Sequence, residues 1–548
     1  MSITETQNKL IFASEREATG SGESGFSSVF VTIPKIQYIQ LQWESQYWKS
    51  QHSLAVEREN ALKVENENLR GQVRDLKQRL YGRKTEKGGQ KNEGQKEDSK
   101  IKNPRGQQNG AKSSGRKLLS GLPVEEEYVD IPEDQKVCRI CGLEHKEFPK
   151  TQDSDVVEVE VRGYIRRIHR KQYIPGCQCE GLPGLITAPP SNRLIEKGKY
   201  GISIWEEILL NKYLYLNPTN RLLQSWADSN IVLSQGTVTG GLKKLMPLFA
   251  PLLEAISKKV LSENLWNVDE TNYKVFVNVE GKAGHGWYLW VFRSQSGVVY
   301  ILDPSRSSEI PKDFFGEDAK GIIVCDRFSA YKKLVKTCVM LLLAFCWAHV
   351  RRDFLDLARS YPELDSWRQA WVERIGALYH LNKLRLEVVG HEDSFKERHR
   401  QLCAHLSEMK KVRGKELKDE QLHKKSGKVL ESMENHWKGL TRFVGNPEVP
   451  MDNNRAENAA RGPKVGAKGY YGAGSKWSGE FAAMMFSILM TIKYSGLNPR
   501  LWLRSYLDAC AKNGNQAPDD LKNFLPWSMD QKRLEELKKN ALSPPFPS

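Results

Sequence analysis

The apolar positions of the N-terminal part follow a seven-residue repeat. Residues 50–81 carry two neighbouring seams of this repeat, formed by Leu62, Leu69 and Leu76 and by Asn66, Val73 and Leu80. Leucine at the d position with one polar Asn at an a position is typical of a parallel coiled coil with a fixed register. The same pattern also suits a single amphipathic helix that packs on its own chain. Residues 1–49 precede it, and about the first 35 are rich in Ser, Gly, Thr and Glu, which predicts disorder.

From about residue 263 the pattern changes to short apolar runs that read as strands. They are Leu265–Asp269, Gly286–Phe292, Val298–Leu302, Gly321–Cys325 and Met340–Trp347, with helical stretches at Ile310–Phe315 and Ser329–Val335. The order β-β-β-α-β-α-β-α is that of a ribonuclease H-like mixed sheet with helices on both faces. A long charged helical region follows Asp353 and reaches about residue 440. It carries an apolar stripe typical of a core, made by Trp367, Trp371, Ile375 and Leu378. We therefore predict an all-helical insertion before the last helix of the sheet domain.

The region between these two patterns contains two cysteine pairs around a β-rich stretch. The pairs are Cys138 with Cys141 and Cys177 with Cys179. Cys-x-x-Cys spacing is typical of a structural Zn²⁺ site, whereas the Cys-x-Cys spacing of the second pair is tighter. His145 or His169 could replace one ligand. Unrelated buried thiols are the alternative.

A pair of helices precedes the first strand. Thr219–Asp228 reads as one helix, Ser229 and Asn230 break it, and Ser234 is suited to cap the next helix. This arrangement resembles a helix-turn-helix, whose second helix would enter a major groove. An ordinary helical hairpin would have the same pattern.

The length of 548 residues permits several domains. We predict a disordered or uncertain segment 1–49, a coiled coil 50–81, a basic linker 82–117, a small zinc-binding β domain 118–195, a helical DNA-binding segment 196–260, a first catalytic core part 261–355, a helical insertion 356–445, a second core part 446–500 and a C-terminal segment 501–548. The predicted fold class is thus multidomain, combining α+β and α/β parts.

The chain is basic, with a net charge of +16 and a pI of about 9.2, which favours a polyanionic partner. Residues 83–117 contain 11 Lys and Arg against 4 Asp and Glu, a net charge of +7 in one short segment. Arg105 in this segment could reach a minor groove, or simply belong to a solvated linker. We find no pattern of a signal peptide, and the longest apolar run, Val339 to Ala348, is far shorter than the roughly 20 residues that span a bilayer. We therefore expect a cytoplasmic, nucleoid-associated protein without a membrane partner.

Three acidic residues are the candidate catalytic centre. Asp269 and Asp326 each follow an apolar run, and Glu457 lies near the start of a helix. Two aspartates at neighbouring strand ends and a helical glutamate can hold two Mg²⁺ (or Mn²⁺) ions for phosphodiester cleavage and joining. Each has an alternative: Asp326 could cap a helix near Ser329, Glu457 could sit at N3 of a capping box with Asn454, and Asp269 could be a solvated strand end. Glu270 should point to the opposite face of its strand, so we give it no metal role.

Two basic groups are candidate phosphate contacts. The first lies at the start of a helix after the last strand and comprises His349, Arg351 and Arg352. His349 could also orient a nucleophile, and a structural Trp/His pair with surface arginines is the alternative. The second lies in a Gly-rich, aromatic run that we expect to be flexible, and comprises Arg461, Lys464 and Lys468. A bare Gly-rich turn is the alternative there.

At these residues the chain resembles the transposases of the insertion sequence 66 family, over most of its length. The similar motifs are Leu80–Lys87, Arg105–Lys112, the cysteine pairs, Val268–Thr271, Cys346–Phe354, Asp452–Glu457, Ser487–Pro499 and Leu525–Trp527. The resemblance implies DDE transposition of the chain's own element, with the terminal inverted repeats bound by the N-terminal region. It makes Asp269, Asp326 and Glu457 the triad. The chain departs from the family at Asn458, where Arg is usual, at Ala467-Lys-Gly, where Arg-Lys-Asn is usual, and in the shortened second cysteine pair.

These patterns lead to one principal hypothesis and two alternatives. We expect a metal-dependent transposase that binds element ends and target DNA as a homodimer or larger oligomer, with accessory proteins of the element as further partners. A catalytically inactive DNA-binding or architectural protein would keep the coiled coil, the zinc domain and the linker, but would gain little from three carboxylates. A nuclease of ribonuclease H-like fold would hydrolyse DNA without joining ends.

Overall fold

A computed structural model describes residues 32–81, 191–280 and 284–538, together with short stretches between residues 130 and 189. The chain divides into two compact units. One consists of Met1–Glu97 with Asp353–Val372, and the other of Asp98–Arg352 with Glu373–Ser548. The candidate carboxylates all belong to the second unit.

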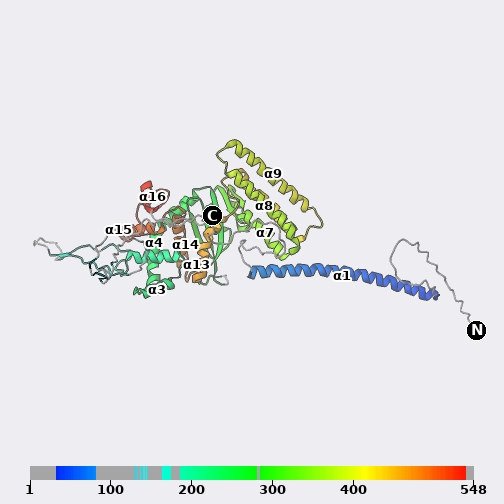
Figure 1. Cartoon of the computed structure of the whole chain (residues 1–548), viewed down its shortest axis with the longest axis horizontal. Coiled ribbons are helices and arrows are strands. Elements are labelled where there is room, and N and C mark those ends of the chain that lie inside the picture. Colours follow the sequence, from blue (N-terminus) through cyan, green and yellow to red (C-terminus); the bar gives the residue numbers. More distant parts are fainter. Residues whose placement is uncertain are drawn as a thin grey trace, which may run out of the picture. The chain divides into compact units, whose positions relative to one another are not determined.

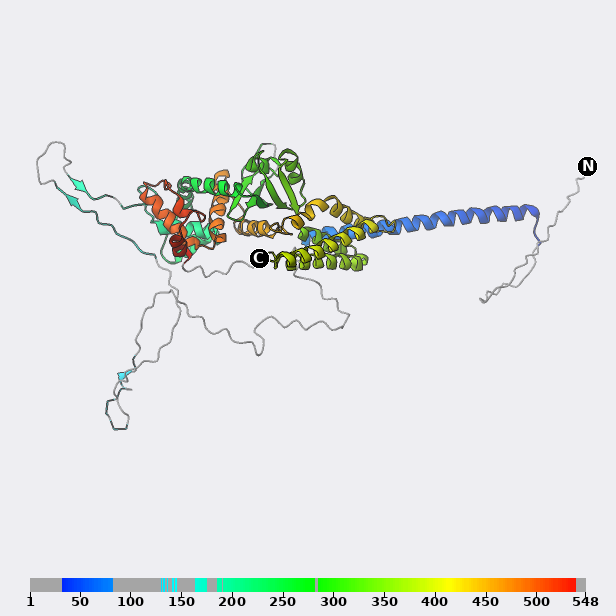
Figure 2. The same ribbon diagram turned by 90° about the horizontal axis from the view of Figure 1, so that it is seen from above.

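The first unit is dominated by helix α1, Lys35–Tyr81, which Figures 1 and 2 show in blue as one uninterrupted helix. It begins about 15 residues earlier than the heptad pattern predicted, because residues 35–49 contain neither Gly nor Pro and continue the helix without a break. The seven-residue spacing of the leucine seam also continues three heptads back from Leu62, through Ala55 and Trp48 to Leu41. The side chains of Leu41, Trp48 and Leu62 are all exposed.

The C-terminal part of α1 contacts the 353–372 segment of the same unit. The guanidinium Nε of Arg74 donates a hydrogen bond to the carbonyl of Ser360 at 2.5 Å. Gly71 lies directly against the ring of Tyr361, where a Cβ atom would approach the ring to 2.3 Å. A residue with a Cβ atom at position 71 would therefore force the Tyr361 ring to shift. Trp371 stacks on Phe354 and is fully buried, so the predicted apolar stripe does serve as core there.

The second unit contains a five-stranded mixed sheet. Its strands are β3 Leu265–Lys274, β4 Gly286–Arg293, β5 Val298–Asp303, β6 Gly321–Cys325 and β7 Leu341–Phe345. The spatial order is β5-β4-β3-β6-β7; β3, β4 and β5 pair antiparallel, and β6 and β7 run parallel to β3. The element order is the predicted one. The predicted end of the first strand was wrong: β3 continues past Asp269 to Lys274, because β4 pairs with it up to Gly286.

Helices cover both faces of this sheet (Figure 1). Alternate residues of a strand point to opposite faces. On one face, Trp266 of β3 contacts Phe315 of α5, Glu309–Phe315, with ring centroids 4.9 Å apart. Helix α6, Ser329–Thr337, lies on this face as well, since its Tyr331 donates a hydrogen bond to Glu270. On the other face, Asn267 contacts the start of α13, Asn454–Tyr470.

The edge strand β5 is covered by helix α14, Lys476–Tyr494. Thr491 Oγ1 accepts a hydrogen bond from the amide of Val298 at 3.0 Å, and Ser487 Oγ accepts one from Tyr300 at 2.9 Å. An edge strand otherwise presents unpaired N–H and C=O groups that can recruit another strand. Two hydroxyls spaced four residues apart on α14 therefore bind two of the outward N–H donors of this edge.

The described part of the chain contains further helices. They are α2 Ile202–Tyr213, α3 Thr219–Asp228, α4 Gln235–Leu261, α7 Trp347–Ser360, α8 Asp365–Leu386, α9 Glu392–Glu416, α10 Lys424–Asn435, α11 Trp437–Leu440, α12 Arg442–Gly445, α15 Pro499–Lys512 and α16 Gln531–Lys538, with 3₁₀ turns at Pro362–Leu364 and Lys522–Phe524. The predicted cap of α4 is confirmed, because Ser234 Oγ accepts from the amide of Thr237 at 3.1 Å. Helix α4 packs against α14 and β5 along its length, while Lys243 and Lys244 stay exposed. Within the described ranges, no helix has the length and apolar character that a membrane crossing requires.

The cysteine-rich region is described only in part. Strands β1, Gln172–Tyr173, and β2, Ile186–Thr187, form an antiparallel pair there. Cys141 is exposed and not in a disulfide, whereas Cys138, Cys177 and Cys179 lie outside the described residues, as does Arg105 in the linker. The zinc site and the minor-groove contact therefore stay predictions.

Candidate carboxylate site

The register of β3 and β6 places Asp269 beside Asp326. The parallel pairing of these strands ends at Asn267, which lies opposite Val324. Asp269 and Asp326 each follow that last pair by two residues, so they lie at the same level along the two strands, although Asp269 stays within the sheet through its pairing with β4. Asp326 Oδ1 accepts a hydrogen bond from the amide of Phe328 at 2.8 Å, so Asp326 also closes the turn before α6. This bond ends on Phe328, the N-cap residue itself, and α6 has no side-chain capping bond, so the helix-cap alternative for Asp326 is not borne out.

Glu457 approaches the two aspartates from the first turn of α13. Glu457 is the fourth residue of the helix, Asn453 is its N-cap, and no side-chain capping bond is present. The capping-box alternative is therefore excluded. Asn453 instead binds the strand below it: its Nδ2 donates to the carbonyl of Val268 at 2.8 Å, and its Oδ1 accepts from Asn267 Nδ2 at 3.0 Å. Both bonds are buried, and they attach the start of α13 to β3 next to Asp269.

The segment before α13 is attached to the end of β7 in the same way. The amide of Trp347 donates to the carbonyl of Met451 at 2.9 Å. The amide of Asn453 donates to Cys346 Sγ at 3.2 Å. Residues 451–453 are therefore tied to the β7–α7 junction as well as to β3. These bonds determine where Glu457 points, although about 130 residues of chain separate it from Asp326.

The electrostatics of Asp269 show how closely the acidic groups approach. Burial raises the pKa of the Asp269 carboxyl to about 8, and the negative charges of Glu270, Glu457 and Asp326 add to the increase. A site with this many carboxylates and little solvent favours either a bound proton or a cation. Glu270 is not available for the cation, because its carboxylate accepts from Tyr331 and forms an ion pair with Arg306 at 2.5 Å. This placement agrees with the opposite-face prediction for Glu270.

A second group of donor atoms adjoins Glu457. Cys346, His349 and Glu457 each offer a ligand atom, and these atoms lie within 4.8 Å of one another. His349 Nδ1 is 3.8 Å from Glu457 Oε1, and both atoms are buried without a hydrogen-bond partner among the described residues. Burial raises the pKa of the Cys346 thiol to about 11, which disfavours a thiolate ligand. The orphaned Glu457 oxygen and the crowded Asp269 carboxyl fit a hard, oxygen-preferring cation better than a thiolate-bound metal.

The basic run after Glu457 is helical, and our prediction of a flexible loop there was wrong. Small residues at helical spacing face the sheet and are buried, namely Ala456, Ala459, Ala460, Pro463 and Gly466. They let α13 lie close to β3 and β4, and this packing outweighs the weak helix propensity of Gly and Pro. Beside this buried face, Arg461, Lys464 and Lys468 are exposed. Their spacings of four, seven and eleven residues from Glu457 put all three on the same helix face as that carboxylate.

The structure thus brings together Asp269, Asp326, Glu457 and His349, and it aligns the α13 cations with them. Arg351 and Arg352 lie on the first turns of α7 and are partly exposed. Two residues with a positioning role were missed from the sequence, Asn453 and Asn267. Asn267 carried a signal, because it is a polar residue inside the apolar run Leu265–Val268.

Two aspartates from neighbouring strands and a helical glutamate, gathered at one edge of a mixed sheet, define a class of carboxylate sites suited to divalent cations. Residues 197–481 match the family model described as transposase IS66 family, and the chain belongs to this family. Membership implies a DNA transposase, an enzyme that binds DNA and acts on it, usually with divalent metal ions. The family resemblance seen in the sequence is thereby confirmed.

Three relatives come from Sinorhizobium fredii (strain NBRC 101917 / NGR234). Uncharacterized protein y4jD is 26% identical over 449 residues, which cover 79% of this chain and 85% of the relative. Uncharacterized protein y4hP is 22% identical and covers 76% and 78% of the two chains. Uncharacterized protein y4qI is 25% identical and covers 68% and 70%. The similarity therefore extends well beyond the residues that match the family model.

Proposed function

We propose that this transposase cleaves the ends of its own insertion sequence and joins the 3′-hydroxyls to target DNA at a site formed by Asp269, Asp326 and Glu457. The observation that carries the proposal is the convergence of these carboxylates, which come from two strands and a helix far apart in the sequence. Strand order β5-β4-β3-β6-β7, with the first three strands antiparallel, supports a ribonuclease H-like core. In that fold the three residues form the DDE triad.

The three carboxylates would hold Mg²⁺ or Mn²⁺, two ions in the proposed arrangement. Such ions activate the attacking oxygen and stabilise the leaving oxygen of an in-line displacement. The residues supply hard oxygen donors, and the unpartnered Oε1 of Glu457 provides one directly. His349, with Nδ1 3.8 Å from that oxygen, would keep the Glu457 carboxylate oriented and donate to an oxygen of the reacting phosphate or nucleophile.

The exposed face of α13 is the proposed path of the DNA backbone at this site. Glu457 stands at one end of this face, and Arg461, Lys464 and Lys468 follow it along the helix. Cations in line with a catalytic carboxylate would bind successive phosphates on one side of the scissile bond. Arg351 and Arg352 would add contacts from α7.

The N-terminal region is proposed to recognise the terminal inverted repeats and to pair two protein copies. The exposed seam of α1, from Leu41 through Leu62 to Leu76, suits a parallel coiled coil between two chains. A dimer would bring two element ends together. Zn²⁺ bound by Cys138, Cys141, Cys177 and Cys179 would stabilise the small domain between α1 and the core.

The test is a strand-transfer assay with labelled, pre-cut element ends, a target plasmid and Mg²⁺. Asp269→Asn and Glu457→Gln should abolish joining and leave end binding intact. Asp519→Asn and Glu431→Gln are matched controls, because both side chains are exposed and remote in sequence from the triad. Joining by either triad variant would refute the assignment. Hydrolysis without joining by the unmodified chain would favour the nuclease, and binding without cleavage would favour the architectural protein.

A further inference from the structure

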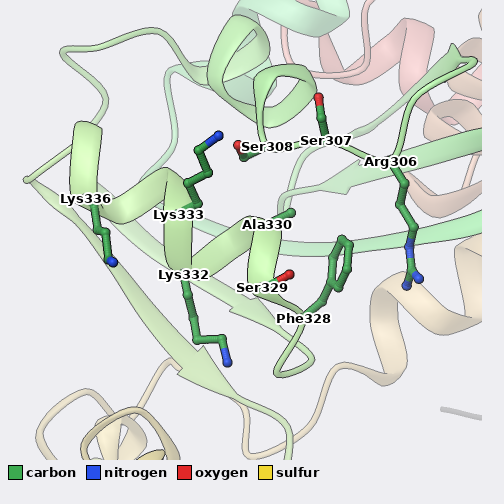
Figure 3. A pocket seen from close by; sticks show the side chains of 9 residues that line it. All are labelled: Arg306, Ser307, Ser308, Phe328, Ser329, Ala330, Lys332, Lys333 and Lys336. Carbon is green, nitrogen blue, oxygen red and sulfur yellow. The ribbon is translucent and has the colours of Figure 1, made fainter.

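A basic pocket lies between α5 and α6, on the face of the sheet that does not carry α13. It has a volume of about 640 Å³ and is lined by Arg306, Ser307, Ser308, Phe328, Ser329, Ala330, Lys332, Lys333 and Lys336. Figure 3 shows Lys333 extending from α6 toward Ser308 at the start of α5, while Lys332 and Lys336 point to other sides of α6. The described lining therefore contains four cationic side chains, three serines and no acidic side chain.

The cations of this pocket are not all neutralised by the protein. Arg306 is paired with Glu270 at 2.5 Å, and Lys332 Nζ lies 3.2 Å from His436 Nε2. Lys333 and Lys336 are exposed, and neither forms an ion pair with another described residue. The pocket thus presents excess positive charge to solvent, together with serine hydroxyls that can donate hydrogen bonds.

The pocket adjoins the carboxylate site through the chain itself. Phe328, which lines the pocket, donates its amide to Asp326. Its ring lies under the Arg306 guanidinium, 4.0 Å from ring centroid to Cζ. Arg306 in turn is held by Glu270, the neighbour of Asp269 in β3. The pocket and the α13 cations are therefore two separate positive regions, one on each face of the sheet.

We infer that this pocket binds backbone phosphates of the target DNA without reading its sequence. The inference rests on the proposed function, which requires a second DNA segment beside the element end. Lysine and serine contacts to phosphate oxygens position a duplex but carry no sequence information, which suits a partner of varied sequence. The face with Arg461, Lys464 and Lys468 holds the element end, and the α5–α6 pocket holds the target.

The first experiment measures the salt dependence of binding to a labelled random-sequence duplex by fluorescence anisotropy, with the full-length chain. The variant is Lys333→Gln/Lys336→Gln, and the matched control is Lys410→Gln/Lys411→Gln, which removes the same charge from two exposed lysines of α9. Two lost phosphate contacts should reduce the slope of log K against log salt by roughly 1.8, since each contributes about 0.9. At each salt concentration the Lys333/Lys336 variant should bind a terminal-repeat duplex with the same affinity as the unmodified chain.

An unchanged slope for the Lys333/Lys336 variant would overturn the inference. So would an equal reduction in the Lys410/Lys411 control, or an equal loss of terminal-repeat binding, because each would show a general charge effect. Lysine acetylation of the unmodified chain gives a second measurement that is independent of variant folding. Random-sequence duplex should protect Lys333 and Lys336 at least several-fold and leave Lys410 and Lys411 reactive. Equal reactivity with and without DNA would overturn the inference as well.

Failure of this inference is distinguishable from failure of the proposed function. If the unmodified chain joins ends to target DNA but Lys333 and Lys336 are not protected, only the pocket assignment is wrong. If the chain does not join ends under any condition, the proposed function fails whatever the protection pattern.

Discussion

Replacing Asn453 with Ala tests whether the start of α13 is held in place by β3. The substitution removes two buried hydrogen bonds, one to the Val268 carbonyl at 2.8 Å and one from Asn267 Nδ2 at 3.0 Å. It leaves a buried carbonyl and a buried amide without partners, and each unsatisfied group costs about 1–3 kcal/mol. We therefore expect Asn453→Ala to lower the free energy of unfolding by about 2–6 kcal/mol.

The same change should reduce catalysis more than it reduces end binding. Glu457 is one turn beyond Asn453, so a looser helix start displaces its carboxylate relative to Asp269. A displacement of about 1 Å at a reacting centre can lower the rate on the order of 100-fold. Strand transfer and end binding should be measured side by side at a temperature where the variant is folded.

Asn454→Ala is the matched control, because Asn454 is exposed and its side chain makes no hydrogen bond with another described residue. Asn454→Ala should change the free energy of unfolding by no more than about 0.5 kcal/mol. A double-mutant cycle with Asn267→Ala should give a coupling of about 1 kcal/mol between the two amides. The reasoning would be refuted if Asn453→Ala and Asn454→Ala had equal stability and equal joining rates.

Three further predictions concern the edge strand, the acidic site and α1. Thr491→Val leaves the Val298 amide unpaired and should lower the free energy of unfolding in urea by about 1–3 kcal/mol. Ser495→Ala, at the half-exposed end of α14, should lower it less. Equal losses would contradict the interpretation that α14 covers the edge of β5. In EDTA the unmodified chain should lose thermal stability as the pH rises from about 4 to about 8, because the raised pKa of Asp269 makes the folded state hold a proton that the unfolded state loses. Asp269→Asn should remove part of that loss. Parallel pH profiles of the two proteins would count against the raised pKa of Asp269. Leu62→Glu combined with Leu69→Glu should abolish self-association of the chain in sedimentation experiments. Val64→Glu, which changes an exposed residue outside the leucine seam, should leave self-association intact. If both variants were monomeric, the leucine seam would be excluded as the specific interface.

The strands were predictable because their apolar runs are short and bounded by turn residues. The error at the end of β3 has a physical cause. Glu270 is a charged residue within a strand, and it is accommodated only because Tyr331 and Arg306, from distant parts of the chain, bind its carboxylate. No local pattern reveals those partners.

The carboxylates were predictable as a set, but the geometry of Glu457 was not. The glycines and the proline of α13 predict a loop when propensity alone is considered. Their small side chains are instead what allows the helix to lie against β3 and β4. Asn453 was equally hidden, since an Asn beside another Asn indicates a turn or cap, and its actual partners on β3 are 185 and 186 residues away.

The cover of strand β5 also has a consequence for the order in which the protein can be made. The hydroxyl of Thr491 that binds the Val298 amide lies 193 residues further along the chain. At about 5–20 residues per second, a ribosome needs roughly 10–40 s to add that segment. During this interval the backbone N–H groups of β5 lack their partners on α14. For most of it, Glu457 has not yet been synthesised. A chain interrupted before residue 457 would therefore have both an unprotected strand edge and an incomplete acidic site, whereas one interrupted between residues 457 and 491 would have the three carboxylates but still lack the Thr491 cover of β5.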